Sequence, residues 1–117
     1  MGFLKAKLSG SSDGEPILIT GTTSTAANTL HTTSTSAGDN TWDEIYLWGF
    51  NNGTGDVNLT IEYGSTSHVI VQTLSAKAGL SVPILPGTVG NTGLVVKAFK
   101  GGSATVGVLG FVNQISS

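Results

Sequence analysis

The sequence of 117 residues has the length of one domain and carries few charges: five Lys, no Arg and seven Asp or Glu give a net charge of −2. This balance argues against a nucleic-acid partner, which requires clustered Lys and Arg, and no apolar run approaches the roughly 20 residues that cross a bilayer. The absence of Cys excludes disulfides and thiolate metal sites. We expect neither a nucleic-acid nor a membrane partner, and synthesis in a cytoplasm without export by a standard route.

The first third of the chain is poor in strong strand signals. We interpret residues 1–13 as a short N-terminal arm and residues 14–117 as the domain proper. A first strand is predicted at 16–20, "PILIT", because Pro is tolerated at the start of a strand. Within the Ser- and Thr-rich stretch that follows, "NTLHTTST" at 28–35 predicts an edge strand of small polar residues.

The strongest strand signal is "WDEIYLWGFNNGTGDVNLTIEYG". Apolar and polar residues alternate cleanly in its second half, as in a strand with one buried face. The central "NNGTG" supplies the Asn and Gly residues of a tight reversal. The sequence therefore predicts a hairpin of two strands at 43–51 and 56–63.

The remainder continues with short strands separated by Gly and Pro. Because Pro cannot donate to a sheet, the segment containing Pro83 is predicted as an edge strand. The predicted elements are a strand at 68–76, a turn at 77–79, a short strand at 80–85, a loop at 86–93, and a closing hairpin of 94–100 with 104–115.

No segment shows a helical period, and strand signals recur every 10 to 15 residues. The expected fold is therefore all-β: a single-domain antiparallel β-sandwich of seven to eight strands with a short N-terminal arm. The sequence leaves the choice between a jelly-roll and an immunoglobulin-like topology open.

Several strands are apolar on both sides, whereas a sandwich needs one buried face per sheet. The apolar residues beyond those of one buried face include Tyr46, Trp48 and Phe50 in one strand and Val95 and Phe99 in another. Long loops, the N-terminal arm or a second copy of the chain could cover them. Because large aromatic residues and few charges are typical of interface cores, we expect contact between copies.

The sequence shows no catalytic constellation. His31 and His68 have no metal-ligand spacing, and we expect both at the surface or on an edge strand. Asp56 and Glu62 lie on the polar side of one strand, roughly 20 Å apart at strand rise, too far for paired acid–base work. We expect both carboxylates to be solvated, and we predict no enzyme activity, no metal and no cofactor.

Carbohydrate binding is the alternative function. Small β-sandwiches often stack sugars on exposed aromatic rings, and Trp42, Tyr46, Trp48 and Tyr63 could form such a platform. This reading describes a glycan-binding β-sandwich module.

The segments "WDEIYLWGFNN", "GDVNLTIEYG", "GLVVKAFKGG" and "VLGFVNQI" resemble small virion structural proteins of tailed bacteriophages, over most of residues 40–115. The resemblance implies a decoration, or cement, protein that binds the exterior of the capsid, often as a homotrimer, and stabilises the shell. Its partners would be further copies of itself and the major capsid protein. It carries no catalytic residues to this chain. The resemblance also implies synthesis in the cytoplasm of a bacterial host, and it would make the alternative glycan-binding module part of a phage tail fibre, baseplate or adhesin.

Two groups of residues are predicted at contacts with other copies or with the capsid. The first group is Tyr46, Trp48 and Phe50 together with Val95 and Phe99. The second comes from the N-terminal arm, which in such proteins commonly reaches a neighbour, and consists of Phe3 and Leu4.

Overall fold

The structure is a computed structural model that describes residues 2–34 and 41–116, with residues 2, 3 and 116 described by their backbone alone. Within these ranges it contains nine strands and one short 3-10 helix, in agreement with the predicted all-β class. The elements are β1 Gly2–Lys7, β2 Ile17–Leu18, η1 Ser24–Ala26, β3 Asn28–Thr32, β4 Trp42–Asn51, β5 Val57–Tyr63, β6 Val69–Leu74, β7 Leu85–Gly90, β8 Val95–Lys100 and β9 Val106–Ser116.

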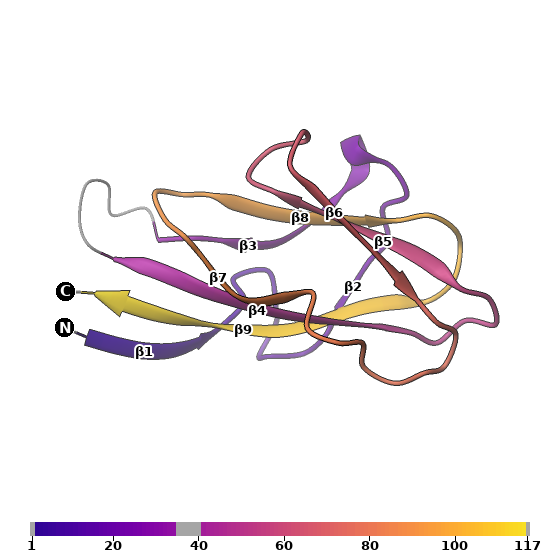
Figure 1. The fold of residues 1–117 in the computed structure, drawn as a ribbon, viewed down its shortest axis with the longest axis horizontal. Helices are drawn as coiled ribbons and strands as arrows, with labels where there is room; N and C mark the ends of the chain where they lie inside the picture. Colours follow the sequence, from indigo (N-terminus) through magenta and orange to yellow (C-terminus); the bar gives the residue numbers. More distant parts are fainter. Residues whose placement is uncertain (1, 35–40, 117) are drawn as a thin grey trace.

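The strands form two sheets that pack face to face (Figure 1). Sheet A has the order β1-β9-β4-β7, and the two-residue strand β2 pairs with β9 beside β1. Sheet B has the order β3-β8-β5-β6. Every described pair of strands is antiparallel, so the predicted antiparallel sandwich is confirmed.

The pairing of the eight longer strands decides the topology that the sequence left open. The first of them pairs with the last (β1 with β9), the second with the seventh (β3 with β8), the third with the sixth (β4 with β7) and the fourth with the fifth (β5 with β6). Nested pairs of this kind, distributed over two sheets, are the arrangement of a jelly roll.

The core lies between the sheets and follows from the alternation of each strand. Ile45 and Leu47 of β4 face Leu59 and Ile61 of β5, and all four side chains are fully buried. Burying such a side chain stabilises the fold by about 1.5–3 kcal/mol. The same alternation places Tyr46 and its neighbours of even number on the outside of sheet A.

The predicted hairpin of 43–51 and 56–63 is wrong in its pairing, although both strands exist. β4 belongs to sheet A and β5 to sheet B, so the "NNGTG" turn is an arch that crosses from one sheet to the other. The closing pair makes the same crossing, from β8 in sheet B to β9 in sheet A. The two arches are joined by a backbone hydrogen bond from Asn52 N–H to the carbonyl of Thr105.

Two further local predictions need correction. The segment 80–85 is irregular up to its last residue, and the strand runs from Leu85 to Gly90, through residues predicted as a loop. Its partner β4 supplies the hydrogen bonds, and a bulge at Gly87 (φ 104°) accommodates the Pro-Gly sequence. Pro86 is compatible with this strand because β7 is an edge of sheet A.

The N-terminal segment forms part of the sandwich in the single chain. Residues 2–7 are the edge strand β1, which pairs with β9 from Gly2↔Ser116 to Lys7↔Phe111. Residues 8–13 then lead across the sandwich, where Leu8 is buried in the core. The expected arm thus contributes one strand and one core side chain to its own domain.

Candidate functional site

The outer side of sheet A carries a continuous group of aromatic side chains, which we call the aromatic face: Tyr46, Trp48 and Phe50 of β4 and Phe111 of β9. All four are half-buried. They share one side because residues two apart in a strand point the same way, and because Tyr46 and Phe111 are register partners across β4 and β9. No tertiary layer of the described chain lies over them.

Three of the four rings of the aromatic face stack on one another. Tyr46 and Phe111 have centroids 4.7 Å apart and planes inclined by 14°. Trp48 lies 6.3 Å from Tyr46 and 6.0 Å from Phe111. On the side of Phe111 that faces β1, the Nζ atom of Lys5 lies 4.4 Å from the ring centroid. Phe111 is therefore held between an ammonium group and a phenol ring, and each such contact contributes about 0.5–1.5 kcal/mol.

Two rings of the aromatic face pack directly against glycines of the neighbouring strands. The ring of Phe50 lies so close over Gly107 that a Cβ atom there would be 2.3 Å from its Cζ. The hydroxyl of Tyr46 lies over Gly87, 2.9 Å from the position of a Cβ. This close packing covers part of each ring, and the part that remains exposed is the candidate contact surface.

Charge is confined to the borders of the aromatic face. Lys5 and Lys7 lie on β1 and Glu44 near the start of β4, whereas Leu109, next to the rings on β9, is half-buried and apolar. Trp42 continues the apolar surface and is 41% exposed. A flat apolar centre with a sparse charged rim is the composition of a protein contact surface.

The structure does not bring all predicted contact residues together. Val95 and Phe99 are half-buried on the outer side of sheet B, opposite the aromatic face. Leu4 lies on the edge strand β1 and is 60% exposed. The backbone of Phe3 also lies in β1, opposite Ile115, and its side chain is outside the described residues.

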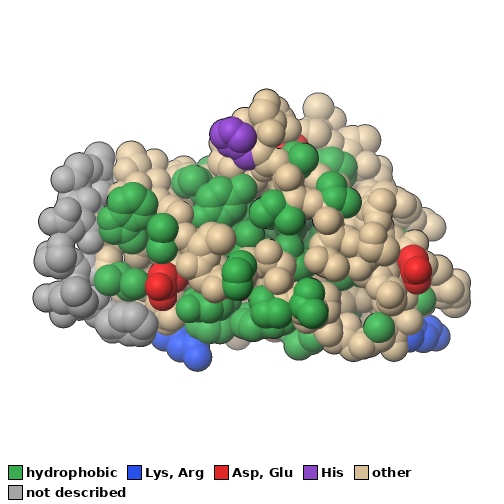
Figure 2. Space-filling view, viewed as in Figure 1, with side chains coloured by type: hydrophobic (Ala, Val, Ile, Leu, Met, Phe, Trp, Pro, Cys, Tyr) green, Lys and Arg blue, Asp and Glu red, His purple; other side chains and the backbone are tan. Residues whose placement is uncertain are grey.

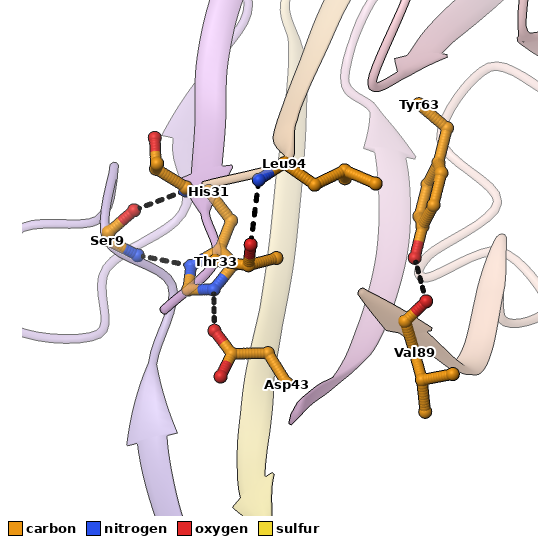
Figure 3. Close-up of polar contacts among 8 residues, drawn as sticks. Ser9, His31, Thr33, Asp43, Tyr63, Val89 and Leu94 are labelled. Carbon is orange, nitrogen blue, oxygen red and sulfur yellow. Dashed lines mark hydrogen bonds and ion pairs between the residues drawn. The ribbon is translucent and has the colours of Figure 1, made fainter. Parts of the chain in front are cut away.

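The predicted glycan platform is likewise divided. Trp42, Tyr46 and Trp48 share the outer side of sheet A, but Tyr63 packs against the core at the end of β5. Its hydroxyl donates a 3.0 Å hydrogen bond to the carbonyl of Val89 on β7 (Figure 3).

A buried polar pair, which the sequence analysis missed, connects the two sheets. His31 lies on the edge strand β3, one of the two expected positions, but it is 3% exposed and therefore not at the surface. Its Nδ1 atom accepts the backbone N–H of Ser9 at 2.9 Å, and Nε2 lies 2.7 Å from Oδ2 of the fully buried Asp43 (Figure 3). Since Nδ1 is an acceptor, Nε2 carries the hydrogen and donates it to Asp43.

This pair is not a nucleophile and its base. The Ser9 hydroxyl accepts a 2.7 Å bond from the Thr32 N–H, and Ser9 contacts His31 only through its backbone. The second carboxylate oxygen of Asp43, Oδ1, is buried without a hydrogen-bond partner in the described part of the chain. The arrangement ties the segment after β1 to both sheets and exposes no reactive group.

The second buried carboxylate is Glu62. It was predicted to be solvated, but it is 4% exposed because η1 covers it and the Ser24 hydroxyl donates a 2.6 Å bond to its Oε2. Asp56 is exposed as predicted and accepts a bond from the Ala76 N–H. Across residues 2–34 and 41–116, no three metal-ligating side chains gather in one place.

Comparisons with protein-family models, with curated proteins and with solved structures returned no match. In the described ranges there is no helix of the length and apolarity needed to span a membrane.

Proposed function

We propose that this protein is a non-enzymatic virion structural protein: a decoration protein that binds the outer surface of a bacteriophage capsid as a homotrimer and stabilises the shell. The observation that carries the proposal is the aromatic face. Four half-buried rings, three of them stacked on one another, occupy the outer side of a sheet whose inner side already supplies the core. An apolar surface beyond the needs of folding indicates a partner.

The stacking geometry favours a protein partner over a small ligand. One side of Phe111 is taken by Tyr46 and the other by Lys5, so the rings present mainly their edges to the outside. Ring edges and aliphatic neighbours such as Leu109 suit the side chains of a packed interface, where aromatic residues are enriched.

The symmetry of a trimer restricts which predicted residues can act together. A three-fold contact is heterologous, so one surface of each subunit meets a different surface of the next. If the aromatic face of one subunit contacted the opposite face of the next, the subunits would stack into an open fibre and not a closed trimer. Val95 and Phe99 lie on that opposite face and are therefore excluded as the counterpart of the aromatic face. The adjacent β1 edge with the exposed Leu4 can close a ring, and we assign it that role.

The fold is compatible with this function by analogy alone. Jelly rolls are common in viral capsid proteins, but they also occur in lectins, and a fold does not imply a function. A decoration protein needs no catalytic group. Many weak contacts distributed over a shell give it avidity.

Glycan binding is the alternative, and one observation favours it: Trp42 is 41% exposed at the end of the aromatic face. A sugar stacked on this indole would shift its fluorescence when host polysaccharide is added. The decoration reading predicts no such shift, and it predicts that neither the unmodified protein nor Trp42→Phe, in which Trp48 is the remaining tryptophan, responds to the polysaccharide.

The test is the native mass followed by capsid rebinding. Size-exclusion chromatography with light scattering is expected to give about three times the chain mass of 11.9 kDa. The protein is then added to phage capsids from which decoration proteins have been stripped, and the pelleted fraction is measured. A monomer that does not pellet with capsids, but does respond to host polysaccharide, would replace this proposal with the glycan-binding one.

A further inference from the structure

The two sheets have four free edges in the described chain, and three are protected against pairing with another strand. β1 carries Lys5 and Lys7, and charged residues on an edge discourage pairing. β7 contains Pro86, which has no N–H to donate, and a bulge. β3 has a register shift after Thr29, and the segment around Ser9 and Gly10 hydrogen-bonds to it.

The fourth edge, β6, has none of these protections. Its register with β5 is regular from Val57↔Leu74 to Glu62↔Val69. The strand "VIVQTL" contains no charge, no Pro and no Gly. Val69, Ile70 and Val71 are 48%, 38% and 56% exposed, although they are among the most apolar residues of the chain.

The apolar character extends to both sides of β6. Val69 and Val71 lie on the outer side of sheet B, and Ile70 lines a groove of about 380 Å³ between the edges β6 and β7. In Figure 1 β6 crosses in front of the other strands of sheet B, and Figure 2 shows hydrophobic side chains over this face with few charged ones.

The backbone of β6 offers hydrogen-bonding groups at alternate residues. Tyr63 N–H donates to the carbonyl of His68, so this register pair is hydrogen-bonded. Pairs alternate along an antiparallel ladder, and the residues between them point their N–H and C=O groups away from β5. On β6 these are Val69, Val71 and Thr73. The Thr73 carbonyl also receives a 3.2 Å contact from the Gln72 side-chain amide.

We propose that β6 pairs with β6 of a second copy of this chain, antiparallel across a two-fold axis at Val71. In this register Val71 faces Val71 of the partner, and Val69 faces Thr73 of the partner. All three outward-pointing residues then satisfy their backbone groups, and the two four-stranded sheets become one sheet of eight.

A second copy fits this edge better than an unrelated strand. An antiparallel pair about Val71 is self-complementary, because the spacing from Val71 to Val69 equals that from Val71 to Thr73. No charged residue lies between 63 and 76, so two copies meet without electrostatic repulsion. The apolar residues that remain exposed in the single chain become partly covered.

This contact is independent of the aromatic face and of the proposed function. The aromatic face lies on the outer side of sheet A, and β6 is an edge of sheet B that pairs only with β5. Both surfaces can be occupied at once: the trimer mass is expected in dilute solution, and masses above three chains are expected as the protein concentration rises and the β6 edges pair. Each contact is removed by substitutions that leave the other intact.

The test introduces single cysteines by substitution. Any cross-link then involves the introduced residue, because the chain has no Cys of its own. In the proposed register two Cys at position 71 have Cα atoms about 5.5 Å apart, within disulfide range. Two Cys at position 73 are about 14 Å apart, four residues along the strand. Val71→Cys is expected to form a covalent dimer with diamide, whereas Thr73→Cys alone is not. A mixture of Val69→Cys and Thr73→Cys is expected to give the mixed dimer.

Equal cross-linking of Val71→Cys and Thr73→Cys, or none in either, would overturn the proposal. Amide hydrogen exchange of the unmodified protein provides a second measurement. The N–H groups of Val69 and Val71 are expected to exchange more slowly at high protein concentration, and exchange that does not depend on concentration would contradict the pairing. Repeating the cross-link with Trp48→Ala present separates this contact from the aromatic face: the β6 dimer must persist.

Discussion

His31 donates its Nε2 hydrogen to Oδ2 of Asp43 across 2.7 Å, and both side chains are almost completely withdrawn from solvent. β3 and β4 belong to different sheets, so this bond joins the two layers of the sandwich. The backbone of Ser9 completes the link by donating to the other ring nitrogen. The three segments are thus held by one imidazole.

His31→Ala is expected to destabilise the fold by about 3–5 kcal/mol, because it leaves the Asp43 carboxylate buried without its partner. The free energy of unfolding in urea is the measurement. The matched control is His68→Ala, at the second histidine of the chain, which is exposed. Similar stabilities of the two variants would show that the buried bond contributes nothing measurable.

Asn51→Ala is expected to destabilise the arch between β4 and β5 by about 1–3 kcal/mol. The Asn51 side chain is 1% exposed; it accepts the Gly53 N–H at 2.8 Å and donates to the carbonyls of Gly55 and Leu74. Asn52→Ala removes the neighbouring, exposed amide and is expected to change stability by less than about 0.5 kcal/mol. The free energy of unfolding in urea is measured for both variants. An equal loss of stability in both would refute the role of Asn51.

Gly110→Ala is expected to cost about 1–3 kcal/mol or more through overpacking. A Cβ atom at this position would lie 2.1 Å from the backbone oxygen of Tyr46, which cannot rotate away. Gly55→Ala is the control, since a Cβ there has no neighbour within 4 Å. Thermal unfolding is expected to show a lower midpoint for Gly110→Ala only; an unchanged midpoint would mean that β4 and β9 are less closely paired than described.

Trp48→Ala is expected to weaken self-association by about 2 kcal/mol, roughly 30-fold in the dissociation constant, if the aromatic face is the trimer contact. The measurement is native mass over a dilution series, with urea unfolding alongside it to detect any loss of folding. Phe99→Ala removes an equally half-buried ring from the opposite face and is expected to leave the mass unchanged. If Phe99→Ala dissociates the oligomer and Trp48→Ala does not, the contact lies on sheet B.

The alternation of side chains was sufficient to predict most strands. In 57–63 apolar residues recur at every second position, and 45–50 is apolar on both sides of an extended chain; the structure has strands at Val57–Tyr63 and Trp42–Asn51. The weakest local signals failed: residues 86–90 of the strand Leu85–Gly90 contain Pro and Gly and were predicted as part of a loop. That strand exists because β4 provides a partner, which a local pattern does not report.

The buried polar pair shows a second limit. His31 and Asp43 are twelve residues apart and match no motif, and nothing in their neighbours distinguishes them from surface residues. Glu62 was likewise predicted to be exposed from the alternation of β5, since η1, which covers it, is 38 residues away at Ser24. Whether a polar residue is buried depends on which segment, distant in the sequence, packs over it.

By itself, the sequence determined the all-β class, the two-sided apolar character of β4 and the position of the turn after it, because these depend on residues within a few positions of one another. Only the tertiary structure decided that β4 and β5 lie in different sheets, that Tyr46 and Trp48 share a face with Phe111 but not with Phe99, and that β6 is the unprotected edge. A turn of five residues permits either a hairpin or a crossing between layers about 10 Å apart. The choice between them rests on which strands, far apart in the chain, bury their apolar sides together.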